Sequence, residues 1–285
     1  MPQAPSNLVI RQAAANDISI ITEFIDTAFL VHRNLDWRPL MEWVEQPPFL
    51  LRFTNHKLTA LLSCAADPEG IAWIHAFIMD QWSGQVNTIW LSLFDPAMAT
   101  LAETRNQVFS VSLSDWYTRL LKSSGFALFQ NIVVLQWGRV MPPSKNIPPE
   151  VFIRPMEPTD LDQVAEVDRQ TFEAAWVISR TSLQSAYLKS SHASVAEIND
   201  RIIGYELSTA NHLSSHLTRL AVLPEFTHQN LGYTLATQML EYFARRGIWQ
   251  ITVNTQDNNH ASLSLYRKLG FFLTSDSFPV FAYSG

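Results

Sequence analysis

A turn in the second half of the chain has the composition of an anion-binding site. It follows an apolar stretch that ends at Leu223, and it contains Pro224, Asn230 and Gly232. A strand, a turn and a helix start in this order can direct several backbone N–H groups toward one point, where unpaired donors and the helix dipole favour negative charge. The segment therefore predicts a phosphate-binding turn. The alternative is an ordinary strand-to-helix connection that binds nothing.

A second segment, from Asn259 to Phe271, has residues typical of both ends of a helix. Asn259 is a typical N-cap residue, and Gly270 is a typical residue for a left-handed helix end. Together the two segments resemble the GNAT-type N-acetyltransferase superfamily, whose members transfer an acyl group from acyl-coenzyme A to an amine. The pyrophosphate loop of that family reads Gln/Arg-x-x-Gly-x-Gly/Ala after Val-x-Pro, and its later signature reads Asn-x-x-Ala/Ser-x-x-Leu-Tyr-x-Lys-x-Gly-Phe.

Most positions of both motifs are matched. The matches are Val222, Pro224 and Gly232 in the loop and Asn259, Ser262, Leu265, Tyr266, Lys268, Gly270 and Phe271 in the signature. The loop departs at Thr227, where Gln or Arg is usual, and at Asn230, where the first glycine is usual. Asn tolerates left-handed backbone better than other non-glycine residues, so the loop shape can survive Asn230. Thr227 removes a long polar side chain but no backbone donor.

The resemblance covers about Val151 to Tyr283 and implies acetyl-coenzyme A as co-substrate, with no metal ion. It implies that backbone donors of the loop hold the phosphates and that the free edge of the preceding strand pairs with the pantetheine amides. A backbone N–H of that strand would meet the oxyanion. The residues expected to bind the coenzyme are Leu220, Ala221, Val222, Thr227, His228, Gln229, Asn230, Leu231, Gly232, Tyr233, Asn259 and Ser262.

The resemblance also implies direct attack of a neutral amine on the thioester, which requires an acid and a base. Tyr266 matches the family's tyrosine, and a phenol with a pKa of roughly 10 can protonate the departing thiolate. Several family members place a glutamate six residues before the motif valine, where this chain has His216. A neutral imidazole suits the role of base, but a structural histidine is equally common at a strand start. Glu206, in the preceding strand, is the second candidate.

The spacing of apolar and turn residues predicts the elements that position these side chains. The expected strands are 151–154, 194–198, 202–208, 217–223, 248–255 and 278–283, and the expected helices are 160–172, 181–189, 233–246 and 259–269. The last of these strands is predicted to complete the sheet of the second half.

The first half repeats landmarks of the second. Val9-Ile10-Arg11 with Asp17 matches Phe152-Ile153-Arg154 with Asp160 at an offset of 143, and the stretch ending at Gly125-Phe126 matches the one ending at Gly270-Phe271 at an offset of 145. Ordered matches at a nearly constant offset indicate a duplication. Between the copies, the segment 141–150 holds four prolines and predicts a stiff, extended linker, because neither helix nor strand pairing continues through it.

The first copy differs at the positions that the resemblance assigns to chemistry. At an offset of 144, Val86 and Thr88 occupy the two turn positions, where β-branched side chains would block the phosphates. Leu121 stands at the place of Tyr266. This half also holds seven of the nine tryptophans, which indicate either ordinary core packing or an apolar acceptor pocket or domain interface.

The resemblance and the repeat together imply an α/β (α+β) fold of two tandem GNAT-like domains. Each domain is expected to have a mixed, mostly antiparallel central sheet flanked by helices. The expected boundaries are 1–139 for a degenerate N-terminal domain, 140–150 for the Pro-rich linker and 151–285 for the catalytic, acyl-CoA-binding domain.

Composition excludes several classes of protein. The 285 residues are 47% hydrophobic and 16% charged, as in a folded protein, and no apolar run approaches the roughly 18 residues of a membrane span. The net charge is −6 without a basic tract, so nucleic acid is not an expected partner. A single cysteine, Cys64, excludes an internal disulfide and is expected to be a buried apolar residue. With no visible secretory signal, a cytoplasmic protein is expected.

The sequence therefore predicts an acyl-CoA-dependent N-acyltransferase that transfers an acetyl group to the amine of a small molecule. Neither a membrane nor a nucleic acid is expected as partner. Two alternatives remain open. One is a non-catalytic tandem protein that senses acyl-CoA or binds a partner, which the departures in the loop motivate, and the other is a protein N-acetyltransferase. The acceptor, the acyl length and the oligomeric state are not fixed by the sequence.

Overall fold

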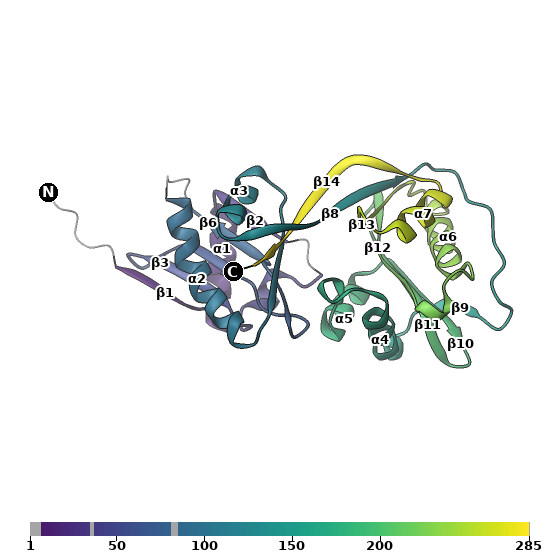
Figure 1. The fold of residues 1–285 in the computed structure, drawn as a ribbon, viewed down its shortest axis with the longest axis horizontal. Helices are drawn as coiled ribbons and strands as arrows, with labels where there is room; N and C mark the ends of the chain where they lie inside the picture. The colour runs from purple at the N-terminus through teal and green to yellow at the C-terminus, as the bar shows by residue number, and fades with distance from the viewer. Residues whose placement is uncertain (1–6, 35–36, 81–84, 285) are drawn as a thin grey trace. The chain divides into compact units, whose positions relative to one another are not determined.

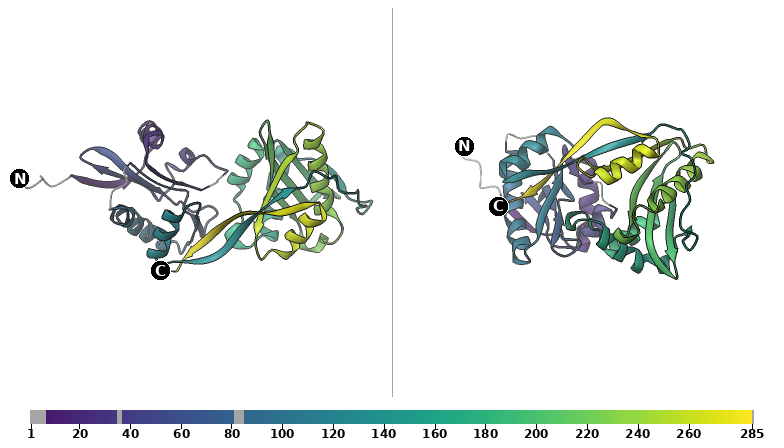
Figure 2. Two further views of the ribbon diagram at one scale, coloured as in Figure 1. Left: turned by 90° about the horizontal axis from the view of Figure 1, so that it is seen from above. Right: turned by 45° about the vertical axis from the view of Figure 1, so that its right-hand side comes forward.

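The chain forms two compact units, each with a sheet and helices packed on it (Figures 1 and 2). The computed structural model describes residues 7–34, 37–80 and 85–284. The first unit extends to Phe129 and includes the C-terminal segment from Pro279, and the second unit comprises Gln130–Phe278. Both units are mixed α/β with largely antiparallel strands, which confirms the predicted fold class.

The first unit is built on a five-stranded antiparallel sheet with the strand order β1-β3-β4-β6-β2. Its strands are β1 (Leu8–Gln12), β2 (Leu30–Arg33), β3 (Phe49–Thr54), β4 (Lys57–Ser63) and β6 (Ala76–Met79), its helices are α1 (Ile18–Thr27), α2 (Val86–Glu103) and α3 (Asp115–Ser123), and β5 (Ile71–Trp73) pairs in parallel with β7 (Gln107–Val111). Trp43 and Trp90 are 2% and 0% exposed, so ordinary core packing explains both. Trp82 lies outside the described residues.

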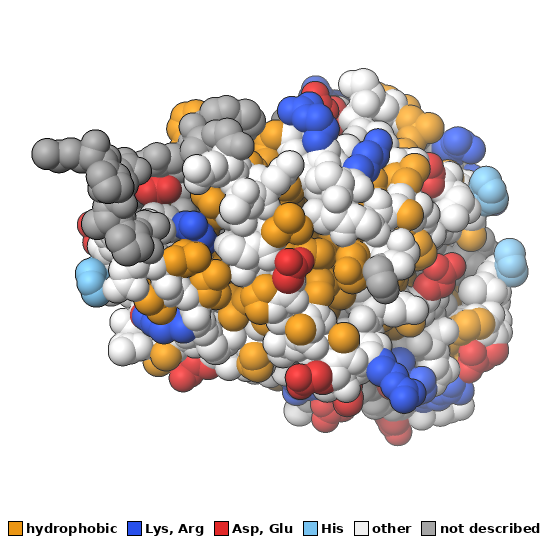
Figure 3. Space-filling model, turned by 60° about the vertical axis from the view of Figure 1, so that its left-hand side comes forward, with side chains coloured by type: hydrophobic (Ala, Val, Ile, Leu, Met, Phe, Trp, Pro, Cys, Tyr) orange, Lys and Arg blue, Asp and Glu red, His pale blue; other side chains and the backbone are white. Residues whose placement is uncertain are grey.

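The edge strands of this sheet expose apolar side chains. Leu8 and Val9 of β1 and Val31 of β2 are between 42% and 48% exposed. Figure 3, with the first unit turned toward the viewer, shows hydrophobic side chains at the surface with few charged ones between them. Both edges of this sheet therefore present apolar side chains to the surface, next to unpaired strand backbone.

The second unit has the strand order β8-β13-β12-β11-β10-β9, in which β12 and β13 are the parallel pair. Its strands are β8 (Phe126–Trp137), β9 (Phe152–Pro155), β10 (His192–Ile198), β11 (Arg201–Ala210), β12 (Ser214–Val222) and β13 (Gln250–Gln256), and its helices are α4 (Leu161–Thr171), α5 (Arg180–Lys189), α6 (Leu231–Ala244) and α7 (His260–Lys268). The strands and helices predicted between 151 and 269 are confirmed within a few residues. Gly247 and Gly270 follow α6 and α7 with φ of 77° and 86°, as left-handed helix ends require.

Helices cover both faces of this sheet. Successive side chains of a strand point to opposite faces. On β11, Tyr205 donates a hydrogen bond to Asp168 of α4, whereas the next residue, Glu206, is bonded to His192, whose ring lies 4.7 Å from that of Tyr242 on α6. Thus α4 and α6 pack on opposite faces.

The duplication is visible in one repeated ion pair. In the first unit, Arg11 donates to both carboxylate oxygens of Asp17 at 2.6 Å, and in the second Arg154 donates to both oxygens of Asp160 at 2.7 and 2.9 Å. Each aspartate also accepts the backbone N–H three residues earlier, at 2.8 and 2.7 Å. These hydrogen bonds hold the pKa of both aspartates below the usual range. The same local structure recurs at the predicted offset.

The last strand differs from the prediction. Residues 278–283 were expected to complete the sheet of the second half, but β14 (Phe271–Tyr283) ends in the first unit, where Val280 to Ala282 pair with β7. In the second unit, β13 pairs instead with β8, through residues 132–136. Two copies of one fold offer similar open strand edges, and the alternation of apolar residues does not distinguish one edge from the other.

The Pro-rich segment 141–150 also differs from the prediction. Residues 141–148 form neither helix nor strand, as expected, but the segment belongs to the second unit and does not connect the two. The Asn230 side-chain amide donates to the Asn146 carbonyl at 3.0 Å, and the Tyr233 hydroxyl donates to the Pro143 carbonyl at 2.9 Å. The segment is therefore fastened to the start of α6.

Replacing Phe281 by Ala should destabilise the first unit. The side chain is 1% exposed and belongs to the core cluster of that unit, and truncating a buried Phe costs about 3–5 kcal/mol because it leaves a cavity. Phe272, on the same strand, is 53% exposed, so Phe272→Ala is the matched control and should cost less than about 1 kcal/mol. Urea denaturation measures both. Equal losses would show that the end of β14 does not pack in this core.

Candidate active site

A cleft of about 340 Å³ opens in the second unit beside the end of β12. It is formed by the end of β12, the turn and first residues of α6, one side of α7, the end of α4 and the Pro-rich segment. The lining residues are Lys145, Thr171, Leu220, Ala221, Val222, Phe226, Thr227, His228, Asn230, Leu231, Gly232, Tyr233, Ala261, Ser262, Ser264, Leu265, Tyr266 and Lys268. Most of the predicted site residues are therefore brought together. Gln229, Asn259, His216 and Glu206 are not in the lining.

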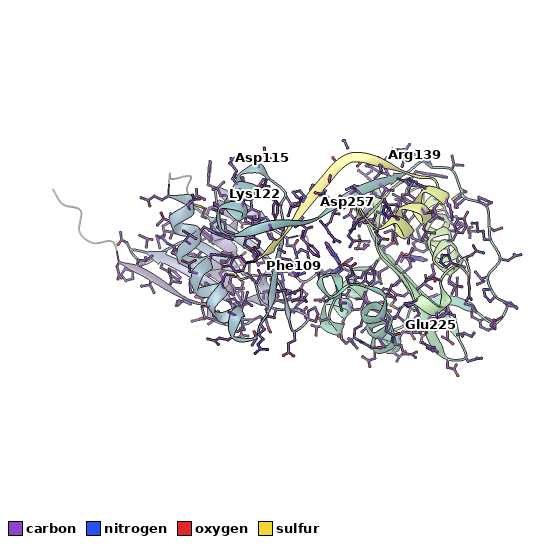
Figure 4. The ribbon with its side chains drawn as sticks, in the orientation of Figure 1. Phe109, Asp115, Lys122, Arg139, Glu225 and Asp257 are labelled. Atoms are coloured by element: carbon purple, nitrogen blue, oxygen red, sulfur yellow. The ribbon has the colours of Figure 1, made fainter. Side chains whose placement is uncertain are left out.

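The cleft exists because two parallel strands separate. β12 and β13 pair only as far as Leu217 and Val253. Beyond this point β12 continues to Val222 along β11 alone, while β13 continues along β8. The Asp257 carboxylate, labelled in Figure 4, accepts a hydrogen bond from the Asn131 side chain at 2.9 Å and secures β13 to β8. Each strand keeps one partner, so the edge of β12 that faces away from β11 has no strand beside it.

A buried ion pair holds β12 in this position. Arg219 donates to the two carboxylate oxygens of Asp168 on α4, at 2.7 and 2.9 Å. The Asp168 side chain is 0% exposed and that of Arg219 is 12% exposed. Arg219 also donates to the Trp176 carbonyl at 2.6 Å, and its guanidinium lies 3.8 Å from the centre of the Phe172 ring. These contacts join β12, α4 and the loop after α4 immediately before the cleft.

The turn before α6 has the geometry of an anion site. Asn230 and His228 have φ of 62° and 64°, so asparagine does adopt the left-handed conformation expected of it. Asn230 is the N-cap of α6, but its side chain does not cap the helix. The first helical bond runs from the Thr234 N–H to the Asn230 carbonyl at 2.9 Å. The N–H groups of residues 231–233 therefore have no acceptor within the helix and stand at the cleft.

Gly232 is not required by the backbone of this turn. It is absent from the glycines with positive φ, and a Cβ added to it would lie 3.5 Å from Leu265 and 3.7 Å from Val222, which is ordinary contact. An alanine would therefore fit in the ligand-free protein. A larger, β-branched side chain would extend further and obstruct the approach of a ligand from the cleft to the backbone N–H groups.

Tyr266 lines the cleft from α7. The side chain is 5% exposed, and burial raises the pKa of its phenol above the ordinary value. The hydroxyl therefore stays protonated at neutral pH, as a proton donor must. Asn259 does not line the cleft. Its side-chain oxygen accepts a hydrogen bond from the Ser262 N–H at 3.1 Å and so fixes the start of α7, which does line it.

His216 lies on β12 just before the strands separate. Its Nδ1 is hydrogen-bonded to the Thr252 hydroxyl of β13 at 2.8 Å. Burial lowers the pKa of His216 to about 4, so its imidazole is neutral at physiological pH. The role of His216 as a base stays a prediction, since it is not in the lining of the cleft.

Glu206 is enclosed in the protein interior outside the cleft. It is 0% exposed, and its carboxylate accepts hydrogen bonds from His192 Nδ1 at 2.6 Å and from the Ser208 hydroxyl. Burial raises the pKa of Glu206 above its ordinary value. An acceptor amine has no access to this carboxylate in the structure, because it faces α6 beneath the sheet surface. The sequence predicts that Glu206 lies in a strand, but it does not predict which face of the sheet its side chain points to.

The first unit differs at the equivalent positions. The helices α2 and α6 begin at an offset of 145, so Gln85 and Asn87, and not Val86 and Thr88, are equivalent to the two turn residues. Gln85 has a φ of −105°, so the left-handed residue at the helix start is missing. Leu121, at the place of the phenol, is 0% exposed in the core.

Several residues that line the cleft are not among the site residues predicted from the sequence. Ala261 and Ser264 lie on α7 near Ser262, and helical spacing could have indicated them. Lys145 and Thr171 come from distant segments, and no local pattern places them at the cleft. Their contribution depends on tertiary structure alone.

Other chemistry is limited in the described part of the chain. Residues 7–34, 37–80 and 85–284 contain no cluster of three His, Cys, Asp or Glu side chains fit to hold a metal ion. No helix in these ranges has the length and apolarity to cross a membrane. Cys64 is a free, buried cysteine, and burial raises the pKa of its thiol to about 12, which makes it a poor nucleophile.

A protein-family model matches the segment that contains most of the cleft residues. Residues 161–271 match the Acetyltransferase (GNAT) family. A putative [ribosomal protein bS18]-alanine N-acetyltransferase of Bacillus subtilis is 26% identical over 120 residues, which are 41% of this chain and 78% of that protein. N-alpha-acetyltransferase 30 of Schizosaccharomyces pombe is 30% identical over 82 residues, which are 27% of this chain and 55% of that protein.

Solved structures share the fold over nearly the whole chain. A tandem GNAT protein from the clavulanic acid biosynthesis pathway has a TM-score of 0.66 at 13% identity, over 97% of this chain and 98% of that one. A GCN5-related N-acetyltransferase from Sphaerobacter thermophilus has a TM-score of 0.61 at 14% identity, over 96% and 95%. The family segment contains the turn, α6 and α7. The match to the Acetyltransferase (GNAT) family therefore falls on the residues that form most of the cleft.

Proposed function

We propose that the second unit transfers the acetyl group of acetyl-coenzyme A to a primary amine. The observation that carries this proposal is the cleft itself, which joins unpaired N–H groups at the start of α6, the free edge of β12 and the protonated phenol of Tyr266. An anion site, a strand edge and a proton donor correspond to the phosphates, the amides and the leaving thiolate of one ligand.

Some groups of the site bind the coenzyme, and others transfer protons. The N–H groups of residues 231–233 bind phosphate, and the edge of Leu220 to Val222 pairs with the pantetheine amides and meets the thioester oxygen. The amine nitrogen attacks the thioester carbon, the carbon–sulfur bond breaks, and Tyr266 protonates the departing sulfur. The proton of the amine leaves through water, and His216 is the proposed base, although burial lowers its pKa to about 4 and so makes it a weak proton acceptor. The products are the N-acetyl compound and coenzyme A.

Gly232→Val tests the phosphate site. The loop motif of the family accepts Gly or Ala at this position, but a β-branched side chain is larger and would obstruct the approach of a phosphate to the backbone N–H groups. The affinity for acetyl-coenzyme A should fall at least tenfold in isothermal titration. Gly232→Ala is the matched control, because a Cβ at this position meets only ordinary contacts, and it should bind as the wild type does. Unchanged affinity in Gly232→Val would remove this turn from the coenzyme site.

Tyr266→Phe tests the proton donor. The ring and its packing remain, so the dissociation constant for acetyl-coenzyme A should change less than threefold. Loss of the acid should lower kcat about 10²–10⁴-fold. Release of free thiol during turnover measures this rate. An unchanged kcat would show that another group, or water, protonates the thiolate.

The acceptor is proposed to be the amine of a small molecule. One relative is named as a putative [ribosomal protein bS18]-alanine N-acetyltransferase and the other as an N-alpha-acetyltransferase, so a peptide N-terminus is the second candidate. A panel of small amines and of short peptides with free N-termini, assayed by thiol release with acetyl-coenzyme A, separates the two classes. We expect the highest kcat/KM with a small amine. Turnover of peptides alone would assign the protein class, and binding without turnover of any amine would favour a sensor.

A further inference from the structure

The Pro-rich segment brings a cation to the cleft. The Tyr233 hydroxyl donates to the Pro143 carbonyl, and the Asn230 amide donates to the Asn146 carbonyl, at 2.9 and 3.0 Å. These two hydrogen bonds come from the first residues of α6 and bracket Lys145 in the sequence. Lys145 is therefore held near the start of the helix although it lies far from it along the chain.

The side chain of Lys145 also lies near the start of α6. Its Nζ lies 4.2 Å from the centre of the Tyr233 ring, and the residue is part of the lining of the cleft. A cation over an aromatic face is attracted to it, which restricts the ammonium without neutralising it. Within the described ranges Lys145 makes no ion pair, so its charge is available to a ligand.

The charge of the cleft is opposite to that of the chain. Its described lining includes Lys145 and Lys268 but no Asp or Glu, whereas the whole chain carries a formal charge of −6. The ammonium of Lys145 near the start of α6, the unpaired N–H groups of residues 231–233 and a second lysine in the same cleft make a site for a ligand with more than one negative charge.

Thr227 leaves room for such a cation. The family places a long Gln or Arg side chain at this position, but here the Thr227 hydroxyl donates to the Pro224 carbonyl at 2.8 Å and stays within its own turn. The loop thus lacks a long polar side chain at Thr227, and Lys145, from outside the loop, supplies one in the same cleft.

We propose that Lys145 is a phosphate-binding residue of the coenzyme site, supplied by the Pro-rich segment in place of the missing side chain at Thr227. This inference rests on the proposed function, because the phosphates are those of an acyl-coenzyme A. It gives the Pro-rich segment a part in ligand binding, and it makes Tyr233 a positioning residue for Lys145.

Lys145→Met tests the inference, because methionine keeps an unbranched apolar side chain and removes the charge. Isothermal titration with coenzyme A should show at least a tenfold rise in the dissociation constant and a weaker dependence of affinity on salt. Lys189→Met, at the exposed end of α5, is the control and should bind as the wild type does. Pantetheine, which lacks every phosphate, should bind both variants and the wild type equally.

Dephospho-coenzyme A identifies the phosphate. A loss with both coenzyme A and dephospho-coenzyme A places Lys145 at the diphosphate, and a loss with coenzyme A alone places it at the 3′-phosphate. Both results support the proposal. Unchanged binding of coenzyme A to Lys145→Met, or an equal loss with pantetheine, would overturn it.

Tyr233→Phe tests the positioning role. It removes the hydrogen bond to Pro143 but keeps the ring beneath Lys145, so affinity for coenzyme A should fall two- to fivefold while that for pantetheine stays the same. A purely structural role would lower both. If the wild type bound no coenzyme A, the proposed function would fail together with this inference. If the wild type bound and Lys145→Met bound equally well, only this inference would fail.

Discussion

The buried ion pair between Asp168 and Arg219 is the constraint on which the cleft depends. Its carboxylate is 0% exposed, and it accepts bonds from Arg219, from Tyr205 and from the Ile178 N–H. Leaving one buried charge without its partner costs about 3–5 kcal/mol, so Arg219 cannot turn away from α4 at little cost. The residue next to it, Leu220, is the first of β12 to line the cleft. The position of the strand is therefore fixed before any ligand arrives.

This constraint explains why the two strands stay apart. An exposed strand edge would gain hydrogen bonds by closing onto its neighbour, and β12 and β13 already pair up to Leu217. Closure beyond that point would have to move β12 away from α4 or β13 away from β8, and each of these contacts is already made. The unpaired donors of β12 and of the start of α6 therefore share one cavity without folding onto each other. Such preorganised donors bind and stabilise developing charge without a reorganisation cost.

The local parts of this arrangement could be read from the sequence. The helix end at Gly270, the left-handed Asn230 and the recurrence of an arginine followed by an aspartate in both halves depend on residue type and short spacing, and each is predicted from the sequence. Three features could not be predicted. The exchange of the last strands, the docking of the Pro-rich segment on α6 and the burial of Glu206 depend on which of several similar surfaces a segment contacts. A strand pattern gives alternation, but it does not name the partner strand or the face.

The two copies separate scaffold from chemistry. Arg11 and Asp17 keep the contacts of Arg154 and Asp160 with nearly the same distances, so the start of each unit is held by the same bonds. At the helix that would carry the anion site, however, the left-handed Asn230 has only Gln85 as its equivalent, with a φ of −105°. Both units need such ion pairs for folding, because each unit must bury its own core. A binding turn needs a strained residue and unpaired donors, which stabilise nothing by themselves. The start of α6 has both features, which favours a ligand there, whereas Gln85 at the start of α2 has no left-handed conformation to maintain.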